Sequence, residues 1–139
     1  MDYNKNREKY IQIDGMMNMN FEWYNPKTGV PSVSIASYGL TFSSGALEAL
    51  GEPEYVVLGF DEQNMIIGVK ACSSEEPKRI PFISKKRSNY VRLSSKDFIR
   101  FLESRMPEDF KVESKATKYY SKWDRDNQIL KIHLEQPVE

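Results

Sequence analysis

Apolar and polar residues alternate along two stretches near the start of the chain. Residues 17–23 alternate Met, Phe and Trp with Asn and Glu, and residues 33–37 alternate Val and Ile with Ser. A period of two is typical of a strand that is buried on one face. The Asp14-Gly15 pair and the stretch "NPKTG" (25–29) are turn signals before and between these strands. We therefore predict β-hairpins in an N-terminal extension, residues 1–37.

A second pattern occurs twice: a short apolar strand, a Ser-Ser pair, and then apolar residues at helical spacing. The two copies are "GLTFSSGALEAL" (39–50) and "YVRLSSKDFIRFL" (90–102). Superposing the two Ser-Ser pairs gives an offset of 51 residues. This offset places Leu47 on Phe98, so we predict that these two residues begin the apolar face of each helix.

Both predicted helices have start and stop signals. Ser94 stands three residues before Asp97, so we predict that its hydroxyl caps the second helix while Asp97 interacts favourably with the helix dipole. The first helix is expected to end at Gly51 and the second before Pro107. The face predicted for the second helix consists of Phe98, Phe101, Leu102 and Arg105.

Each predicted helix precedes a candidate hairpin whose turn has the form Asp-x-x-Asn. These turns, Asp61–Asn64 and Asp124–Asn127, lie 63 positions apart, so the second copy has a longer connection between helix and turn. The unit β-α-β-β therefore occurs twice, and chance similarity of short amphipathic segments is the alternative. The predicted fold is α+β and sheet-rich, with two β-α-β-β repeats forming a small barrel-like core beside the N-terminal β-hairpins.

The predicted repeats span residues 38–76 and 89–136, and a basic linker, residues 77–88, joins them within one compact domain. A length of 139 residues with 40% hydrophobic content suits a single core. One cysteine and one histidine allow neither an internal disulfide nor a zinc framework. The sequence has no signal-peptide pattern and no apolar run of the roughly 20 residues needed to span a bilayer. We expect a cytoplasmic protein without a membrane partner.

Charge is distributed unevenly along a chain whose formal net charge is zero. Residues 43–77 contain seven acidic residues and one lysine, a net charge of −6, whereas residues 78–100 contain eight basic residues and one aspartate, a net charge of +7. Such asymmetry indicates a polyanionic partner for the basic half or an acidic surface that docks on it. The alternative is that mixed surface charge serves solubility alone.

Residues 38–72 resemble the AbrB/MazE/MraZ-like (SpoVT-AbrB type) DNA-binding fold. Its repeat begins with a Gly-led strand, continues into a short helix ending in Leu-Gly, and finishes in a hairpin. The matching positions are Gly39, Phe42, Leu50, Gly51, Val56, Leu58, Ile66 and Val69. The tandem arrangement is most similar to MraZ, with residues 90–102 as a more divergent second copy. The resemblance implies a small interlocked barrel that contacts DNA through basic residues near the strand-to-helix turn.

The first copy departs from the family pattern, because Ser43 replaces a common proline and Glu48 stands in the helix where arginine is common. The second copy keeps a basic footprint on the strand, the helix and the preceding loop. Its predicted nucleic-acid-binding residues are Lys85, Lys86, Arg87, Arg92, Lys96 and Arg100. The alternative is a solvated face whose long side chains cover Phe98 and Phe101.

Catalytic signatures of the common enzyme classes are missing, so we predict a non-enzymatic protein that needs no metal and no cofactor. His133 is expected on the polar face of the last strand, as a surface residue. Cys72 ends an apolar strand, and no second cysteine or histidine stands near it in the sequence to activate its thiol.

Aromatic residues support an alternative function, a protein-binding module such as a small inhibitor or adaptor. They lie on the N-terminal strand, with Met17 and Met19, and on the lysine-rich second hairpin. The residues are Phe21, Trp23, Tyr119, Tyr120 and Trp123. If the N-terminal apolar side is open, it implies a protein partner or a homodimer. Packing of the hairpin aromatics on their own strands is the simpler explanation.

Overall fold

The computed structural model describes residues 21–108 and 110–138. The predicted turn at Asp14-Gly15 and the strand residues Met17 and Met19 lie outside the described residues. Residues 21–31 contain turns but no strand.

Strands dominate the described chain, as predicted for a sheet-rich α+β fold. The first elements are β1 (Ser32–Ala36), β2 (Gly39–Phe42), α2 (Ser44–Leu50), β3 (Tyr55–Asp61) and β4 (Ile66–Cys72). Two short strands, β5 (Ile80–Pro81) and β6 (Lys86–Arg87), flank the 3₁₀ helix η1 (Ile83–Lys85). The last elements are β7 (Tyr90–Ser94), α3 (Lys96–Arg105), β8 (Thr117–Asp124) and β9 (Ile129–Pro137). The element order β-α-β-β thus occurs at both predicted places.

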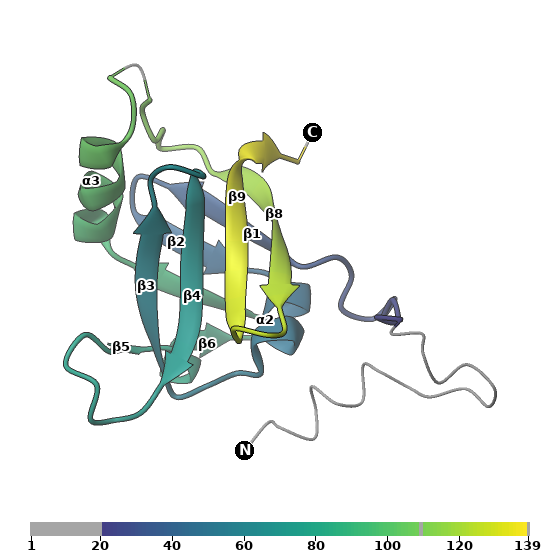
Figure 1. Ribbon diagram of the computed structural model, residues 1–139. Coiled ribbons are helices and arrows are strands. Elements are labelled where there is room, and N and C mark those ends of the chain that lie inside the picture. Colours follow the sequence, from purple (N-terminus) through teal and green to yellow (C-terminus); the bar gives the residue numbers. More distant parts are fainter. Residues whose placement is uncertain (1–20, 109, 139) are drawn as a thin grey trace, which may run out of the picture.

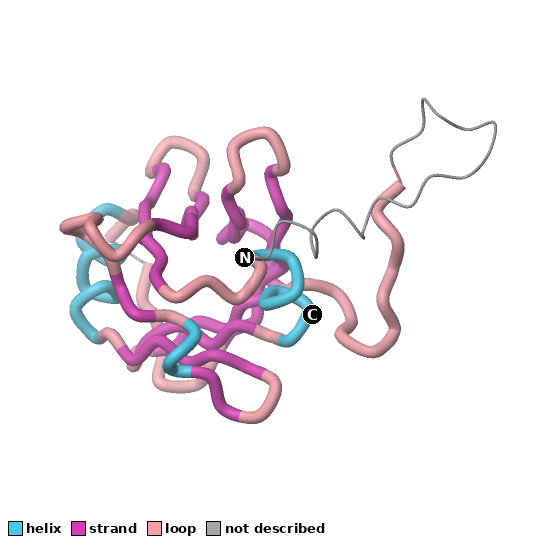
Figure 2. Tube along the Cα trace, turned by 90° about the horizontal axis from the view of Figure 1, so that it is seen from below, coloured by secondary structure: helices cyan, strands magenta, loops and turns pink. Residues whose placement is uncertain are grey.

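Within the described residues, nine antiparallel strands form one sheet in the order β5-β3-β4-β9-β8-β1-β2-β7-β6. The sheet curls into a half-barrel, with β3, β4, β9 and β8 in front of β1 and β2 in Figure 1 and the strands bending round in Figure 2. The two edge strands, β5 and β6, are separated in sequence by residues 82–85 alone. The amide of Phe82 also donates to the carbonyl of Glu54 (2.8 Å), so this connection stays close to the start of β3.

The core lies inside the curl, where apolar side chains from every second strand residue meet. Phe42 and Phe82 are fully buried and pack edge to face, with ring centroids 5.0 Å apart. Helix α2 adds Ala46, Leu47 and Leu50 to this core. The core therefore joins residues from both halves of the chain into one packed unit.

Strand β1 is an interior strand, so the predicted hairpin between residues 17–23 and 33–37 is wrong for the part that the structure describes. β1 pairs with β2 through the tight turn at residues 37–38, and its other edge pairs with β8. Both edges of β1 are thereby hydrogen-bonded, so neither edge is free to pair with the segment that contains Phe21 and Trp23. Those two side chains are 47% and 40% exposed and lie against each other, with ring centroids 5.4 Å apart.

The helix caps correct the predicted alignment of the two halves by one residue. Ser43 caps α2 by accepting from the amide of Ala46 (3.2 Å), and Ser95, not Ser94, caps α3 by accepting from the amide of Phe98 (3.2 Å). Ser94 is instead the last residue of β7. The buried strand residues still match at an offset of 51, but the caps match at 52, because the second half has one extra residue between strand and helix.

The buried face of α3 shifts accordingly. Ile99 and Leu102 are its buried residues, whereas Phe98 is half-buried and Phe101 is 38% exposed. Counted from the caps, Ile99 rather than Phe98 corresponds to Leu47. The predicted helix ends are confirmed, because Gly51 is the C-cap of α2 and Met106, the residue before Pro107, is the C-cap of α3.

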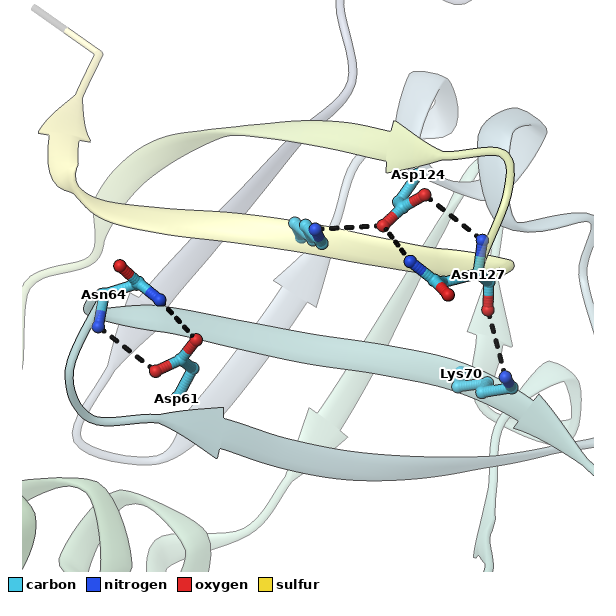
Figure 3. Close-up of polar contacts among 6 residues, drawn as sticks. Asp61, Asn64, Lys70, Asp124 and Asn127 are labelled. Atoms are coloured by element: carbon cyan, nitrogen blue, oxygen red, sulfur yellow. Dashed lines mark hydrogen bonds and ion pairs between the residues drawn. The ribbon is translucent and has the colours of Figure 1, made fainter.

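Both Asp-x-x-Asn turns are formed, with the same hydrogen bonds (Figure 3). The amide of Asn64 donates to Asp61 Oδ1 (3.1 Å), and its side chain donates to Asp61 Oδ2 (2.7 Å). In the second turn, the equivalent bonds from Asn127 to Asp124 measure 3.2 and 2.9 Å. The two turns lie at opposite ends of the adjacent strands β4 and β9, since these strands are antiparallel. Local Asx chemistry is sufficient to specify such turns.

Candidate nucleic-acid interface

The outward side of β7 carries the central residues of the predicted basic surface. Val91 and Leu93 point into the core, so the alternation of the strand directs Tyr90, Arg92 and Ser94 outward. Strand β7 pairs with β2 on one edge and with the short strand β6 on the other. Arg92 is therefore displayed from a strand that is paired on both edges, opposite Thr41 of β2.

The guanidinium of Arg92 is held by three neighbours. Its Nε donates to Thr41 Oγ1 (3.3 Å), and Thr41 is the residue opposite it on β2. The guanidinium carbon lies 5.0 Å from the ring centroid of Tyr38 and 5.9 Å from that of Tyr90. Cation–π contacts and the planar shape of arginine limit the orientations of this group while its other donors stay available. Arg92 is thus a positioned and exposed cation.

A second cation lies in the same row of the sheet. The row crosses four neighbouring strands from β8 to β7 and consists of Lys118, Ser34, Thr41 and Arg92. Three interstrand steps of about 4.8 Å separate its ends, so the row is about 14 Å long. The neighbouring row contains Tyr120, which is 42% exposed, on β8, and Ser32 opposite it on β1. Ser34 and Thr41, which are half-buried, form the middle of the first row between its two cations, whereas Ser32 in the second row is buried.

The other predicted cations lie at the two ends of β7. Lys85, Lys86 and Arg87 precede it, on η1 and β6, and Lys96 and Arg100 follow it, on α3; all are exposed. Lys86 forms an ion pair with Glu52 (2.8 Å). Within residues 21–108 and 110–138, no carboxylate lies within 4.0 Å of the cationic groups of the other four or of Arg92. One of the six predicted binding residues is therefore neutralised by an internal ion pair, and the other five have no such partner in this part of the chain.

The acidic residues of the first half make contacts within the protein. Glu48 accepts hydrogen bonds from Asn25 Nδ2 (2.7 Å) and Thr28 Oγ1 (3.3 Å), which fasten the turn at residues 25–28 to α2. Glu52 pairs with Lys86, as described above. The surface around α2 therefore carries acidic residues and is covered by the turn at residues 25–28. Both features disfavour the binding of an anion there.

The aromatic residues predicted for a protein partner do not form one surface. Tyr119 points inward and is 9% exposed, and burial raises the pKa of its hydroxyl. Trp123 is half-buried and packs against the core. Tyr120 faces outward because neighbouring residues of a strand point to opposite sides. A surface containing both Tyr119 and Tyr120 is therefore incompatible with β8, and Phe21 and Trp23 lie in the separate N-terminal segment.

The remaining titratable candidates stand apart from this interface. His133 is half-buried, and its pKa is lowered first by burial and then by Lys122 and Lys131. Burial also raises the pKa of the Cys72 thiol. Among the described residues, no group of three His, Cys, Asp or Glu side chains could hold a metal ion. These observations add no reactive group to the surface around Arg92.

Sequence reasoning missed four members of this surface: Tyr38, Thr41, Tyr90 and Lys118. Tyr90 and Arg92 alternate on one strand, which is a signal that the sequence contains. Thr41 and Lys118 join the row only through the pairing of β2, β1 and β8, which are distant in the sequence. No local pattern could have brought them together.

Comparisons with protein-family models, with curated proteins and with solved structures find no match. Neither of the α-helices that the described residues form is long and apolar enough to cross a membrane.

Proposed function

We propose that this chain is a small non-enzymatic DNA-binding protein, a regulator of the AbrB-like kind, that binds through its second half. The observation that carries the proposal is the exposed guanidinium of Arg92, held by Thr41, Tyr38 and Tyr90. An arginine positioned in this way contacts a phosphate with less loss of side-chain entropy than a free one. Further cations at both ends of β7 extend the same electrostatic surface.

The proposal includes an internal duplication of the β-α-β-β unit. Strands at equivalent places in the two units pair with each other, β2 with β7 and β4 with β9. Strand β1 pairs with β8, and β5, which stands in the segment before β7, pairs with β3. Two related units packed about an approximate two-fold axis would produce this set of antiparallel pairs. The resemblance to AbrB-like proteins implies a barrel of this kind.

Only the second unit is suited to bind phosphate. The two central partners Thr41 and Arg92 face each other across β2 and β7, so the polar threonine of one unit occupies the place that arginine has in the other. In addition, Glu48 on α2 would repel an anion, and Glu52, just after α2, is already paired with Lys86. We therefore infer that binding is one-sided and centred on β7.

A salt titration of DNA binding tests this proposal. The double variant Lys85→Gln/Arg87→Gln should weaken binding to random-sequence DNA and reduce the slope of log K against log salt by about 1 for each phosphate that is no longer neutralised. Lys27→Gln/Lys111→Gln removes the same charge from exposed positions elsewhere and should leave the slope almost unchanged. If the intact protein binds no DNA at low salt, or if both double variants behave alike, the proposal is wrong.

A protein-binding role is the second candidate, because three aromatic side chains of the N-terminal segment are exposed: Phe21, Trp23 and Tyr24. Two of them pack on each other, which makes a small apolar patch on a chain whose core is otherwise enclosed. A homodimer through this patch should dissociate in Phe21→Ser/Trp23→Ser. Sedimentation of the two proteins at equal concentration measures this; a monomeric native protein would contradict the homodimer.

A further inference from the structure

We propose that the ligand of the surface around Arg92 is a single-stranded nucleic acid whose bases stack on tyrosines. This inference rests on the proposed function and names its substrate class. The stacking strip is defined as the outward residues Tyr38, Tyr90, Arg92, Lys118 and Tyr120, on β7, on β8 and in the turn between β1 and β2.

The strip combines the two components that single-strand binding requires. Aromatic rings stack on bases of any sequence, since every base has a π face, and cations track the backbone phosphates. Here each side of the strip has one of each: Tyr90 with Arg92 on β7, and Tyr120 with Lys118 on β8. The two members of each pair are two positions apart on one strand, so the ring and the cation of each pair point to the same side of the sheet.

Along the row from Lys118 to Arg92, the middle of the strip is low enough for bases to lie between its two sides. Ser34 and Thr41 are the outward residues of β1 and β2 in the row between Lys118 and Arg92. Short side chains on these central strands leave the larger rings standing above them at both sides.

The shape of the strip disfavours duplex DNA. Reading a duplex requires an α-helix or a two-stranded ribbon that enters a major groove about 12 Å wide. The strip spans four hydrogen-bonded strands and is about 14 Å wide between β7 and β8, so it does not fit inside that groove. Stacking on its tyrosines also requires bases with a free face. In an intact duplex, each base face is covered by the neighbouring base pair.

Arg92 couples the two components of the strip. Its contacts with Tyr38 and Tyr90 hold the guanidinium against two aromatic rings, and a base can stack on this planar cation. A lysine at this position would keep the charge but lose the planar group. Replacing Arg92 by lysine therefore separates stacking from charge.

Fluorescence anisotropy with labelled oligonucleotides of about 15 nucleotides tests the inference, since this length covers one small binding domain. The ligands are oligo(dT), oligo(rU) and a mixed-sequence blunt duplex of equal length. We expect both single strands to bind more tightly than the duplex. A comparison of oligo(dT) with oligo(rU) reveals whether the 2′-hydroxyl contributes, and equal affinity would agree with recognition by stacking and phosphate contacts alone.

Four variants assign the effect to the strip. Tyr90→Leu and Tyr120→Leu should each weaken single-strand binding about tenfold without changing its salt slope. Arg92→Lys should also weaken binding at an unchanged slope. The matched control is Tyr55→Leu, on β3, because Tyr55 is likewise a half-buried strand tyrosine with an arginine, Arg79, over its ring (5.6 Å). Thermal unfolding of each variant checks that the fold is retained.

The possible outcomes separate this inference from the function on which it rests. If the duplex binds as tightly as the single strands, or if the tyrosine variants bind like Tyr55→Leu, the single-strand inference is wrong while DNA binding stands. If neither duplex nor single strands bind at low salt, the proposed function itself fails.

Discussion

The two helices follow strands of similar pattern but occupy different environments. In α2, five of seven residues are buried, whereas in α3 only two of ten are buried. Helix α2 contacts strands of both halves and lies near the turn between β8 and β9, whereas α3 lies on the opposite side, beyond β3 (Figure 1). One order of elements can therefore produce a core helix in one half and a surface helix in the other.

The segment before β1 accounts for much of this difference. A Cβ atom on Gly45 would lie 2.6 Å from the carbonyl oxygen of Gly29 and 2.9 Å from Pro31 N, so this segment packs directly on α2. Counted from the caps, the corresponding residue of α3 is Asp97, which is exposed. The start of α3 thus keeps Lys96 and Asp97 in contact with solvent, and the basic surface of the second half remains open.

The largest expected effect is at the junction of the two halves, where β2 meets β7. A Cβ atom on Gly39 would lie 2.0 Å from the carbonyl oxygen of Leu93, and its φ is +144°. Gly39→Ala should therefore lower the free energy of unfolding by at least about 4 kcal/mol. Chemical denaturation measures this, with Gly59→Ala as the control, because nothing lies within 4 Å of a Cβ at Gly59. Equal stabilities would contradict the close junction.

The next effect separates the inner and outer faces of α3. Leu102 is fully buried, so Leu102→Ala should cost about 3 kcal/mol through the cavity that it leaves. Phe101 stacks on Phe98 and lies under Arg105 at the surface, so Phe101→Ala should cost about 1 kcal/mol or less. Denaturant midpoints of the two variants test the assignment, and a larger loss for Phe101→Ala would favour the helix face predicted from the sequence.

The serine residues before the helices provide a finer comparison. Ser43 Oγ accepts from the amides of both Ala46 and Ser32, so Ser43→Ala should cost about 2 kcal/mol. Ser95 caps α3 with a single bond, and its replacement by alanine should cost about 1 kcal/mol. Ser94→Ala should change stability by less than about 0.5 kcal/mol. Thermal unfolding of the three proteins ranks them; a larger effect at Ser94 than at Ser95 would restore the original alignment.

The smallest effect concerns the two turns and their response to acid. Hydrogen bonds from Asn127 and Lys131 lower the pKa of Asp124 from 3.8 to about 2, and Asn64 lowers that of Asp61. A lowered folded-state pKa stabilises the protein above the ordinary value, and this stability is lost as pH falls from about 4 to about 2. Asn127→Ala should raise the pKa of Asp124 towards 3.8 in an NMR titration, with Asp61 as the internal reference. An unchanged Asp124 would contradict the described turn.

Much of the fold and part of the site were predictable from the sequence. The β-α-β-β order in each half, the helix ends at Gly51 and Met106 and both Asp-x-x-Asn turns follow from residues within a few positions of each other. Interactions of that range depend on local backbone geometry and side-chain capping, which a short stretch of sequence specifies by itself. The exposure of Arg92 on β7 follows from the same kind of local pattern, the alternation of a strand.

Tertiary structure alone decided the rest. Strand register determines three features that the sequence did not predict. They are the pairing of β1 with β2 and β8 rather than with the preceding residues, the inward direction of Tyr119, and the row that joins Lys118 to Arg92. Register results from pairing between segments far apart in the chain, and a shift of one residue turns every side chain to the other face. The extra residue at Ser94 is a shift of this kind. It follows from the position of the cap of α3 and from the burial of Ile99 and Leu102, both of which depend on packing.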